Sequence, residues 1–150
     1  MPPSFYDCIA VPDSVLPEPL LHAYRSTHYR IHGQNWYLQI GEPQPALRPY
    51  YQRHAVQSAV YLTACNPLGE LLPDEHNARR MEQLRQALQR AGWAYLEGFG
   101  EDPQSEWPGE SSVLLLGMDL HTARAWGQQW QQNALLYCGA DTVPQLVLLR

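Results

Sequence analysis

The stretch AVQSAVYLTACNPLG, residues 55–69, decides the fold that we predict for this chain. Residues 55–65 are a near-continuous apolar run, which predicts a central strand covered on both faces. Asn66-Pro67 then predicts a turn, and an amphipathic helix is predicted a few residues later. A strand that ends in this way presents polar groups at its carboxyl end, where α/β sheets commonly bind ligands.

Two long helices are predicted from apolar side chains that recur every three or four residues. The first covers 75–91, with Asp74 as its cap and Gly92 as its stop. Its buried face is expected to hold Met81, Leu84, Leu88 and Ala91. The second runs from an Asp119 cap through about Gln131. Its inner face is expected to hold Leu120, Ala123, Trp126 and Trp130.

The remaining segments predict a short helix and several strands. The helix covers 20–25, after prolines at 17 and 19 that suit a helix start. Residues 41–49 hold three prolines and are predicted as a loop. Alternation and apolar runs predict further strands at 27–32, 36–40, 93–96, 112–116, 134–137 and 145–149, the first two forming a hairpin.

These elements predict a single α+β domain over residues 17–150, preceded by an irregular arm over 1–16. We expect a mixed or antiparallel sheet of about 5–7 strands, two main helices and a short N-terminal helix. The helices are expected on one or both faces of the sheet.

The charge composition excludes several chemistries. The net charge is −5, and the chain has ten Arg and no Lys. Without Lys there is no Schiff base, no P-loop lysine and no lysine general base. The negative balance argues against nucleic acid as a partner, because binding to that backbone needs clustered positive charge.

The cysteines and the apolar runs indicate a cytoplasmic protein. The three cysteines are widely spaced and form no CxxC motif, so free thiols in a reducing compartment are expected. No signal peptide is recognised at the N-terminus, and no run of about 18 apolar residues suggests a membrane partner.

Polar side chains at predicted strand and helix ends make up the candidate binding site. Thr63, Asn66 and Asn77 come from the segment that joins the central strand to the first long helix, and paired amides can read a planar polar ligand. Arg80 lies one turn after Asn77 and suits a carboxylate or phosphate. The alternatives are that Asn66 only forms the turn, that Asn77 only caps the helix, and that Arg80 is a solvated helix arginine.

Two further clusters extend this site. Glu110 enters a strand beside Ser111, where a carboxylate can act as a general base or as a hydrogen-bond acceptor. Asn133 precedes another strand, where its amide either lines a cleft or satisfies a helix end. Glu110 is the candidate catalytic residue, and its alternative is an ordinary surface carboxylate.

A metal site and a nucleophilic cysteine are the two other kinds of site that the sequence brings into question. His28 and His32 lie on one side of a predicted strand, but no carboxylate or cysteine stands at a supporting spacing, so no metal site is predicted. Cys65 is better explained as a small buried residue than as a nucleophile. No cofactor follows from any motif.

Several short segments, in order, resemble the bacterial family called domain of unknown function 3293. They are AYRSTHY (23–29), LQIG (38–41), LTACNP (62–67), NAR (77–79), WPGESS (107–112) and QNA (132–134). The resemblance implies a small bacterial cytoplasmic protein and carries no reaction with it. It also implies that five residues belong to one site: Arg25, Asn66, Asn77, Glu110 and Asn133.

The leading hypothesis is a domain that binds, or acts on, a nucleotide-like molecule or an anionic metabolite. Arg25 would anchor the anionic group, the three asparagines would position the ligand, and Glu110 would act as acid or base. This requires Arg25 and Glu110 to lie close together. The sequence leaves open whether the domain is an enzyme.

The rival hypothesis is an acidic interaction module, such as an immunity or regulatory protein that binds a basic partner. Its surface would be the acidic segment 97–110, with Trp107 as the anchor. A homodimer interface on the same surface is a third alternative.

Overall fold

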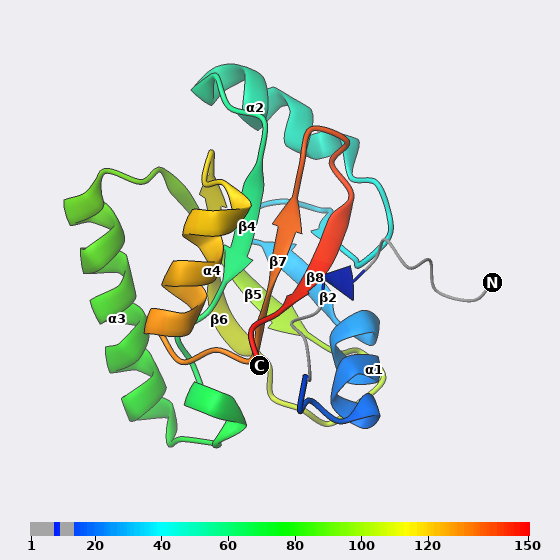
Figure 1. The fold of residues 1–150 in the computed structure, drawn as a ribbon, viewed down its shortest axis with the longest axis vertical. Helices are drawn as coiled ribbons and strands as arrows, with labels where there is room; N and C mark the ends of the chain where they lie inside the picture. Colours follow the sequence, from blue (N-terminus) through cyan, green and yellow to red (C-terminus); the bar gives the residue numbers. More distant parts are fainter. Residues whose placement is uncertain (1–7, 10–13) are drawn as a thin grey trace.

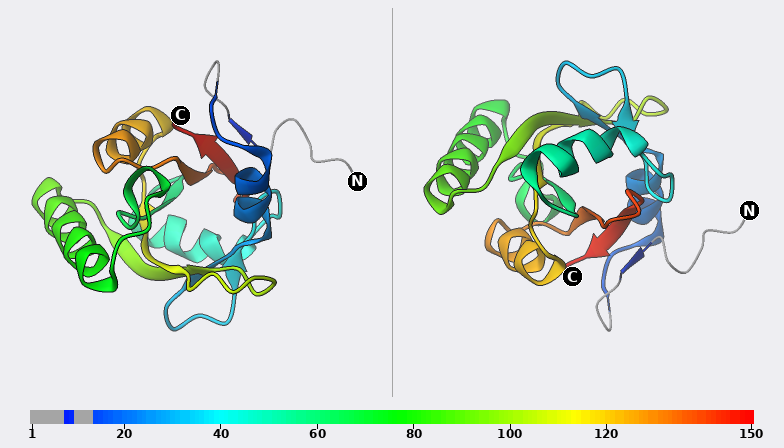
Figure 2. Two further views of the ribbon diagram at one scale, coloured as in Figure 1. Left: turned by 90° about the horizontal axis from the view of Figure 1, so that it is seen from below. Right: turned by 90° about the horizontal axis from the view of Figure 1, so that it is seen from above.

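A strongly curved sheet forms the centre of the molecule (Figures 1 and 2). The structure is a computed structural model that describes residues 8–9 and 14–150. The strands that it describes are β1 (Cys8–Ile9), β2 (His28–Ile31), β3 (Tyr37–Leu38), β4 (Ala59–Leu62), β5 (Tyr95–Glu101), β6 (Glu110–Leu116), β7 (Ala134–Cys138) and β8 (Pro144–Leu148). The α-helices are α1 (Glu18–Ser26), α2 (Arg48–His54), α3 (Asp74–Ala91) and α4 (Leu120–Gln129), and short 3₁₀ helices cover Pro45–Leu47 and Pro67–Gly69.

The strand order across the sheet is β1-β8-β7-β4-β6-β5-β2-β3. Neighbouring strands from β2 to β8 pair antiparallel, and β1 pairs parallel with β8. β4 is the central strand, with Tyr61 opposite Leu114 of β6 and Leu136 of β7. The predicted α+β class, the central strand and the β2–β3 hairpin are therefore confirmed.

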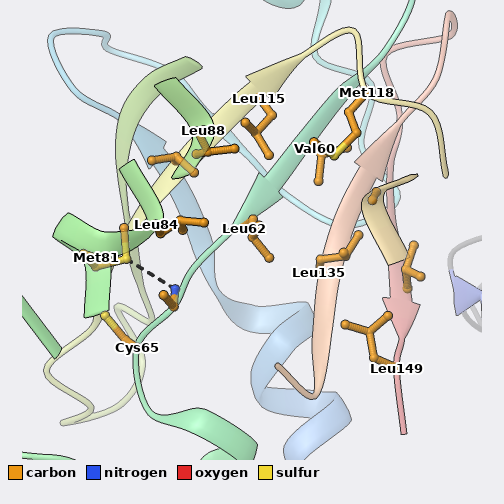
Figure 3. Packing of buried hydrophobic residues seen from close by; sticks show 14 residues of the cluster. Val60, Leu62, Cys65, Met81, Leu84, Leu88, Leu115, Met118, Leu135 and Leu149 are labelled. Carbon is orange, nitrogen blue, oxygen red and sulfur yellow. Dashed lines mark hydrogen bonds between the residues drawn. The ribbon is translucent and has the colours of Figure 1, made fainter. Parts of the chain in front are cut away.

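The two faces of the sheet carry separate hydrophobic cores. On the convex face, α3 and α4 pack over alternate residues of the central strands, and Figure 3 shows Leu84 and Leu88 of α3 beside Leu62 of β4. The concave face holds a second core that includes Tyr61, Leu136 and side chains from α2. In Figure 2, α3 and α4 lie outside the curve of the sheet, whereas α2 lies across one end of it. All four residues of β4 are buried because both faces are covered.

The helix predictions hold with small shifts at the ends. Met81, Leu84 and Leu88 of α3 are buried, and the helix ends at Gly92, whose φ of 82° a residue without Cβ adopts freely. Its N-cap is Pro73, not the expected Asp74. Asp119 caps α4 as predicted, with its carboxylate accepting from the Thr122 N–H at 2.7 Å.

The segment before β4 differs from the prediction. Residues 41–49 were expected to be a loop and 55–65 a strand, yet α2 covers Arg48–His54 and β4 begins only at Ala59. Pro49 lies in the first turn of α2, where a missing N–H costs nothing, and the helix buries Tyr51 against the concave core. Ala55 ends the helix in a left-handed conformation with a φ of 54°.

Two other strands are longer than predicted, which matters for the site. β5 continues through Gly98 and Gly100 to Glu101, and β6 begins at Glu110 instead of at 112. Glu110 is therefore held in the sheet by its pairing with Gly100. Within the arm 1–16, Cys8–Ile9 pair with β8, and residues 1–7 and 10–13 lie outside the described part.

Membrane insertion finds no support in the helices. None of those in the described ranges is both long enough and apolar enough to cross a bilayer.

Candidate functional site

A cavity of about 370 Å³ lies at one end of the concave face, where β4 ends and β6 and β7 begin. Residues of helix α1 and of the segment after β5 line it, and Figure 1 shows these two elements at the same end of the sheet. One part of its lining is aromatic or aliphatic: Leu20, Tyr24, Tyr29, Tyr61, Trp107 and Leu136. The polar part consists of Thr63, Asn66, Glu110, Ser112, Gln132 and Asn133. The volume falls in the range of small-molecule sites.

Glu110 is the central polar group of this cavity. Burial raises the pKa of its carboxyl from 4.5 to about 7, against a smaller lowering by the hydrogen bond from Asn66. Asn66 Nδ2 donates to Glu110 Oε2 at 2.9 Å. Among the described residues, the Glu110 carboxyl has no ion-pair partner and receives no other hydrogen bond. The carboxyl can therefore gain or lose a proton near neutral pH.

The orientation of the Asn66 amide is fixed by its other partners. Its Oδ1 accepts from the Leu72 N–H and from Asn77 Nδ2, both at 2.9 Å. Asn77 Oδ1 in turn accepts from the Asn66 N–H at 2.9 Å. Because the carbonyl side is taken by donors, the NH₂ side faces the Glu110 carboxyl. Asn66 also has a φ of 49°, a conformation that asparagine tolerates better than most residues.

Three tyrosines surround the carboxyl. Burial raises the pKa of the Tyr24 hydroxyl to about 12, and it raises the pKa values of Tyr29 and Tyr61 well above the ordinary value. The charge of Glu110 makes a smaller contribution in the same direction for all three tyrosines. Tyr29 donates its hydroxyl proton to the Tyr24 carbonyl, and Tyr61 donates to the Arg30 carbonyl, each at 2.8 Å. The rings of Tyr29 and Tyr61 meet edge to face at 5.3 Å. These phenols stay neutral and form a rigid wall beside Glu110.

The structure brings most of the predicted site residues together. Thr63, Asn66, Glu110 and Asn133 line the cavity, and Asn77 lies behind Asn66 as its hydrogen-bond partner. These residues come from the carboxyl side of β4, the start of α3 and the amino ends of β6 and β7. Strand ends therefore supply most of the polar lining of this cavity.

Ser111 takes a different place from the one expected. Successive side chains of a strand point to opposite faces, so Glu110 and Ser112 share the cavity face and Ser111 does not. The Ser111 carbonyl accepts a hydrogen bond from Thr63 Oγ1 at 2.7 Å. Ser112 is thus the serine of the cavity wall.

The two arginines expected at the site are engaged elsewhere. Arg25 pairs with Glu18 at 3.3 Å and is absent from the described lining, so the expected proximity of Arg25 to Glu110 does not appear in the cavity. Arg80 donates to the carbonyls of Ala64 and Trp130 and to Gln131 Oε1. Arg80 therefore ties the end of β4 to the segment after α4.

The tyrosines and Ser112 are lining residues that the sequence reasoning missed. A signal for α1 was present, because Leu20, Ala23, Tyr24 and Thr27 recur at helical spacing and all face the cavity. Alternation from Glu110 would have given Ser112, and alternation from Thr63 would have given Tyr61.

Other chemistries find less support in the geometry. Cys65 is buried, burial raises the pKa of its thiol, and its Sγ lies 3.6 Å from the Ser111 carbonyl oxygen. A thiol in this state is a poor nucleophile. In residues 8–9 and 14–150, no group of three or more His, Cys, Asp or Glu side chains is placed to hold a metal ion.

Comparison with known proteins identifies a family. Nothing among the curated proteins or the solved structures matches the chain. A family model described as "Protein of unknown function (DUF3293)" matches residues 62–135, which run from the end of β4 to the start of β7. The matched segment contains Asn66, Asn77, Glu110 and Asn133, and it leaves out α1. The chain belongs to the DUF3293 family.

Proposed function

We propose that this chain is a small-molecule-binding or enzymatic domain whose ligand occupies the cavity, with Glu110 as its acid–base group. The observation that carries the proposal is a mostly buried carboxyl without an ionic partner in the described structure, at the polar end of a cavity of about 370 Å³. Burying a carboxyl without a compensating charge lowers stability, so such a group is typical of functional sites.

The chemistry that this arrangement supports is proton exchange with a bound molecule. A carboxyl with a pKa of about 7 is available both as an acid and as a base near neutral pH. Asn66 holds Oε2, and Asn77 holds Asn66, so the carboxyl does not have to be ordered when a ligand arrives. Asn66 and Asn77 act here as positioning residues.

The sequence led to two expected ligand features, a nucleotide-like body and an anionic group, and the proposal keeps only the first. A planar, nucleotide-like body suits the aromatic wall of Tyr24, Tyr61 and Trp107. An anionic group has no such support, because the described lining contains no Arg or His and the chain has no Lys. The proposal therefore drops the anionic group.

The rival interaction module is less well supported. Its anchor, Trp107, is part of the cavity lining together with Ser105 and Asp102 of the same segment. An aromatic ring on a concave wall suits a small ligand better than a flat protein interface. If the following experiment finds no small-molecule ligand, binding to a protein partner is tested next.

A thermal-shift screen against nucleobases, nucleosides, nucleotides and small acids and amines tests the proposal. A ligand at about 100 times its Kd adds roughly 2.7 kcal/mol of stability. That raises the Tm of a domain of this size by about 5–10 °C. We expect such a shift in the wild type, its loss in Glu110→Gln, and a smaller shift in Asn77→Ala, each relative to the variant's own Tm.

The matched control is Asn35→Ala, because Asn35 is exposed on the turn after β2. It should keep the full shift. A screen in which no compound raises the Tm, or in which Glu110→Gln responds like the wild type, contradicts the proposal. In that case a pull-down with wild type and Trp107→Ala tests the protein-partner hypothesis.

A further inference from the structure

Several hydrogen-bond donors of the cavity wall are already in use within the protein. Thr63 Oγ1 donates to the Ser111 carbonyl, and Gln132 Nε2 donates to the carbonyls of Cys65 and Trp130. Asn66 Nδ2 donates to Glu110. These three side chains therefore offer a ligand mainly their oxygen atoms.

Two of the three tyrosine hydroxyls are engaged in the same way. Tyr29 and Tyr61 donate their protons to backbone carbonyls, so neither offers a proton to a ligand. Glu110 Oε1, by contrast, accepts no hydrogen bond from the described residues. The carboxylate oxygen is the strongest acceptor on this side of the cavity.

The charges of the lining have one sign. Glu110 and Asp102 are its acidic side chains, and none of the described lining residues is Arg, Lys or His. The titratable groups that interact with Glu110 are Tyr24, Tyr29, Tyr61 and Cys65, all neutral at physiological pH because burial raises their pKa values. The ionised Glu110 thus has no cation in the described lining, and the net charge of −5 adds to the attraction for one.

The aromatic wall suits the same kind of ligand. The faces of tyrosine and tryptophan rings attract cations, and Tyr24, Tyr29, Tyr61 and Trp107 line this cavity with Glu110. Leu20 and Leu136 add apolar surface for the body of the ligand. A volume of about 370 Å³ limits that body to a small molecule.

We propose that the cavity selects a small molecule that carries a protonated amine on an apolar or aromatic body, with the ammonium group donating to Glu110. This inference rests on the proposed function and names its ligand class. The ammonium supplies the positive charge that Glu110 lacks in the described lining and a donor for Glu110 Oε1.

Binding is then coupled to the ionisation of Glu110. An alkylammonium stays protonated up to about pH 10, whereas Glu110 gains its charge near pH 7. The affinity for the amine should therefore rise about tenfold from pH 6 to pH 8. A neutral ligand that accepts a proton from Glu110 would show the opposite trend.

The test uses matched probes that differ in one group. Calorimetric titration of the full chain with 2-phenylethylamine, 2-phenylethanol and phenylacetate compares a cation, a neutral molecule and an anion on nearly the same body. Tyramine, tryptamine and hexylamine, each with its alcohol, extend the series to other bodies. Titrations are run at pH 6 and pH 8 with the wild type, Glu110→Gln and the control Glu106→Gln, whose carboxylate is exposed and outside the lining.

We expect at least one amine to bind the wild type at pH 8 more tightly, by tenfold or more, than its alcohol or acid. Glu110→Gln should lose most of this preference and its pH dependence, while Glu106→Gln should keep both. The glutamine amide of Glu110→Gln still offers an oxygen to Asn66, and circular dichroism of each variant verifies the fold.

Three results would overturn the inference. The first is an alcohol or acid that binds as tightly as its amine and loses affinity in Glu110→Gln, which leaves the proposed function standing. The second is an amine preference that Glu110→Gln retains. The third is the absence of binding by every amine in the series at millimolar concentration, and if the broader screen also gives no shift, the proposed function fails as well.

Discussion

At the residue scale, one carboxyl defines the site because of where it is buried. Glu110 would be an ordinary acid in water, but the cavity wall raises its pKa to about 7. Asn66 offsets part of this effect through one hydrogen bond, and it does so in a backbone conformation with positive φ. The surrounding fold maintains a group that is costly to bury, and this cost is measurable.

Replacing Glu110 by glutamine should make stability less dependent on pH. The pKa of Glu110 is about 7 in the folded chain and near 4.5 in the unfolded chain, so the folded state binds more protons between these values. The wild type therefore loses up to about 3 kcal/mol of stability as pH rises from 4.5 through 7, and the loss from this group is complete about one pH unit above 7. Glu110→Gln lacks this loss.

Urea unfolding at pH 5 and pH 8 measures the difference. The gain in stability of Glu110→Gln over the wild type should be larger at pH 8 by roughly 2 kcal/mol or more. The exposed Glu106→Gln should change stability little at either pH. Equal effects of Glu110→Gln at the two pH values would show that the carboxyl is not perturbed.

At the element scale, strand β5 makes room for the cavity wall. Gly98 lies opposite Ile31 of β2 and Ser112 of β6, and the Tyr61 ring passes over it to reach the Arg30 carbonyl. A Cβ at position 98 would lie 2.6 Å from the Arg30 carbonyl oxygen and 2.7 Å from the Tyr61 hydroxyl. A strand interior normally disfavours glycine, so the close approach of Tyr61 explains this residue.

Gly98→Ala should therefore destabilise the protein by about 1–3 kcal/mol. The added methyl group displaces the Tyr61 hydroxyl or the β2 backbone, since both contacts are well below van der Waals distance. Thermal unfolding followed by circular dichroism measures the loss. Gly100→Ala is the matched variant, because its Cβ would meet only ordinary contacts at 3.7 and 3.8 Å. A loss as large in Gly100→Ala as in Gly98→Ala would argue against this explanation.

At the scale of the whole molecule, one sheet joins two cores. The convex core under α3 and α4 and the concave core under α1 and α2 share strands β4, β6, β7 and β8. Val60 and Tyr61 are neighbours in the chain, yet they belong to different cores. A defect in either core should therefore lower the stability of the whole domain, including the cavity on the far face.

Leu84→Ala tests this coupling. Leu84 is fully buried between α3 and the sheet, so its truncation should cost about 2–5 kcal/mol. Tryptophan fluorescence and far-ultraviolet circular dichroism should report one coincident transition in urea, shifted to lower concentration. Val15→Ala, at a side chain that is 69% exposed, should change the midpoint little. Two separate transitions in Leu84→Ala would show that the cores unfold independently.

The sequence by itself determined the features that short-range patterns encode. Helical spacing located α3 and α4, an apolar run located β4, and Asn66-Pro67 marked the turn after it. The same patterns singled out Thr63, Asn66, Asn77, Glu110 and Asn133, because all of them stand at the ends of recognisable elements, while their grouping into one site rested on the family resemblance. These signals depend on residues a few positions apart, so one chain is enough to reveal them.

The tertiary structure decided what each polar side chain meets. Asn66 and Glu110 are 44 positions apart, and Arg80 reaches a carbonyl 50 positions away. No local pattern tells whether an arginine donates to such a carbonyl or is available to a ligand. Nor does a local pattern tell which of Ser111 and Ser112 faces the cavity, because the strand begins two residues earlier than predicted. The pKa of Glu110 follows from the same distant contacts, because desolvation is a property of the packed wall and not of the segment that carries the carboxyl.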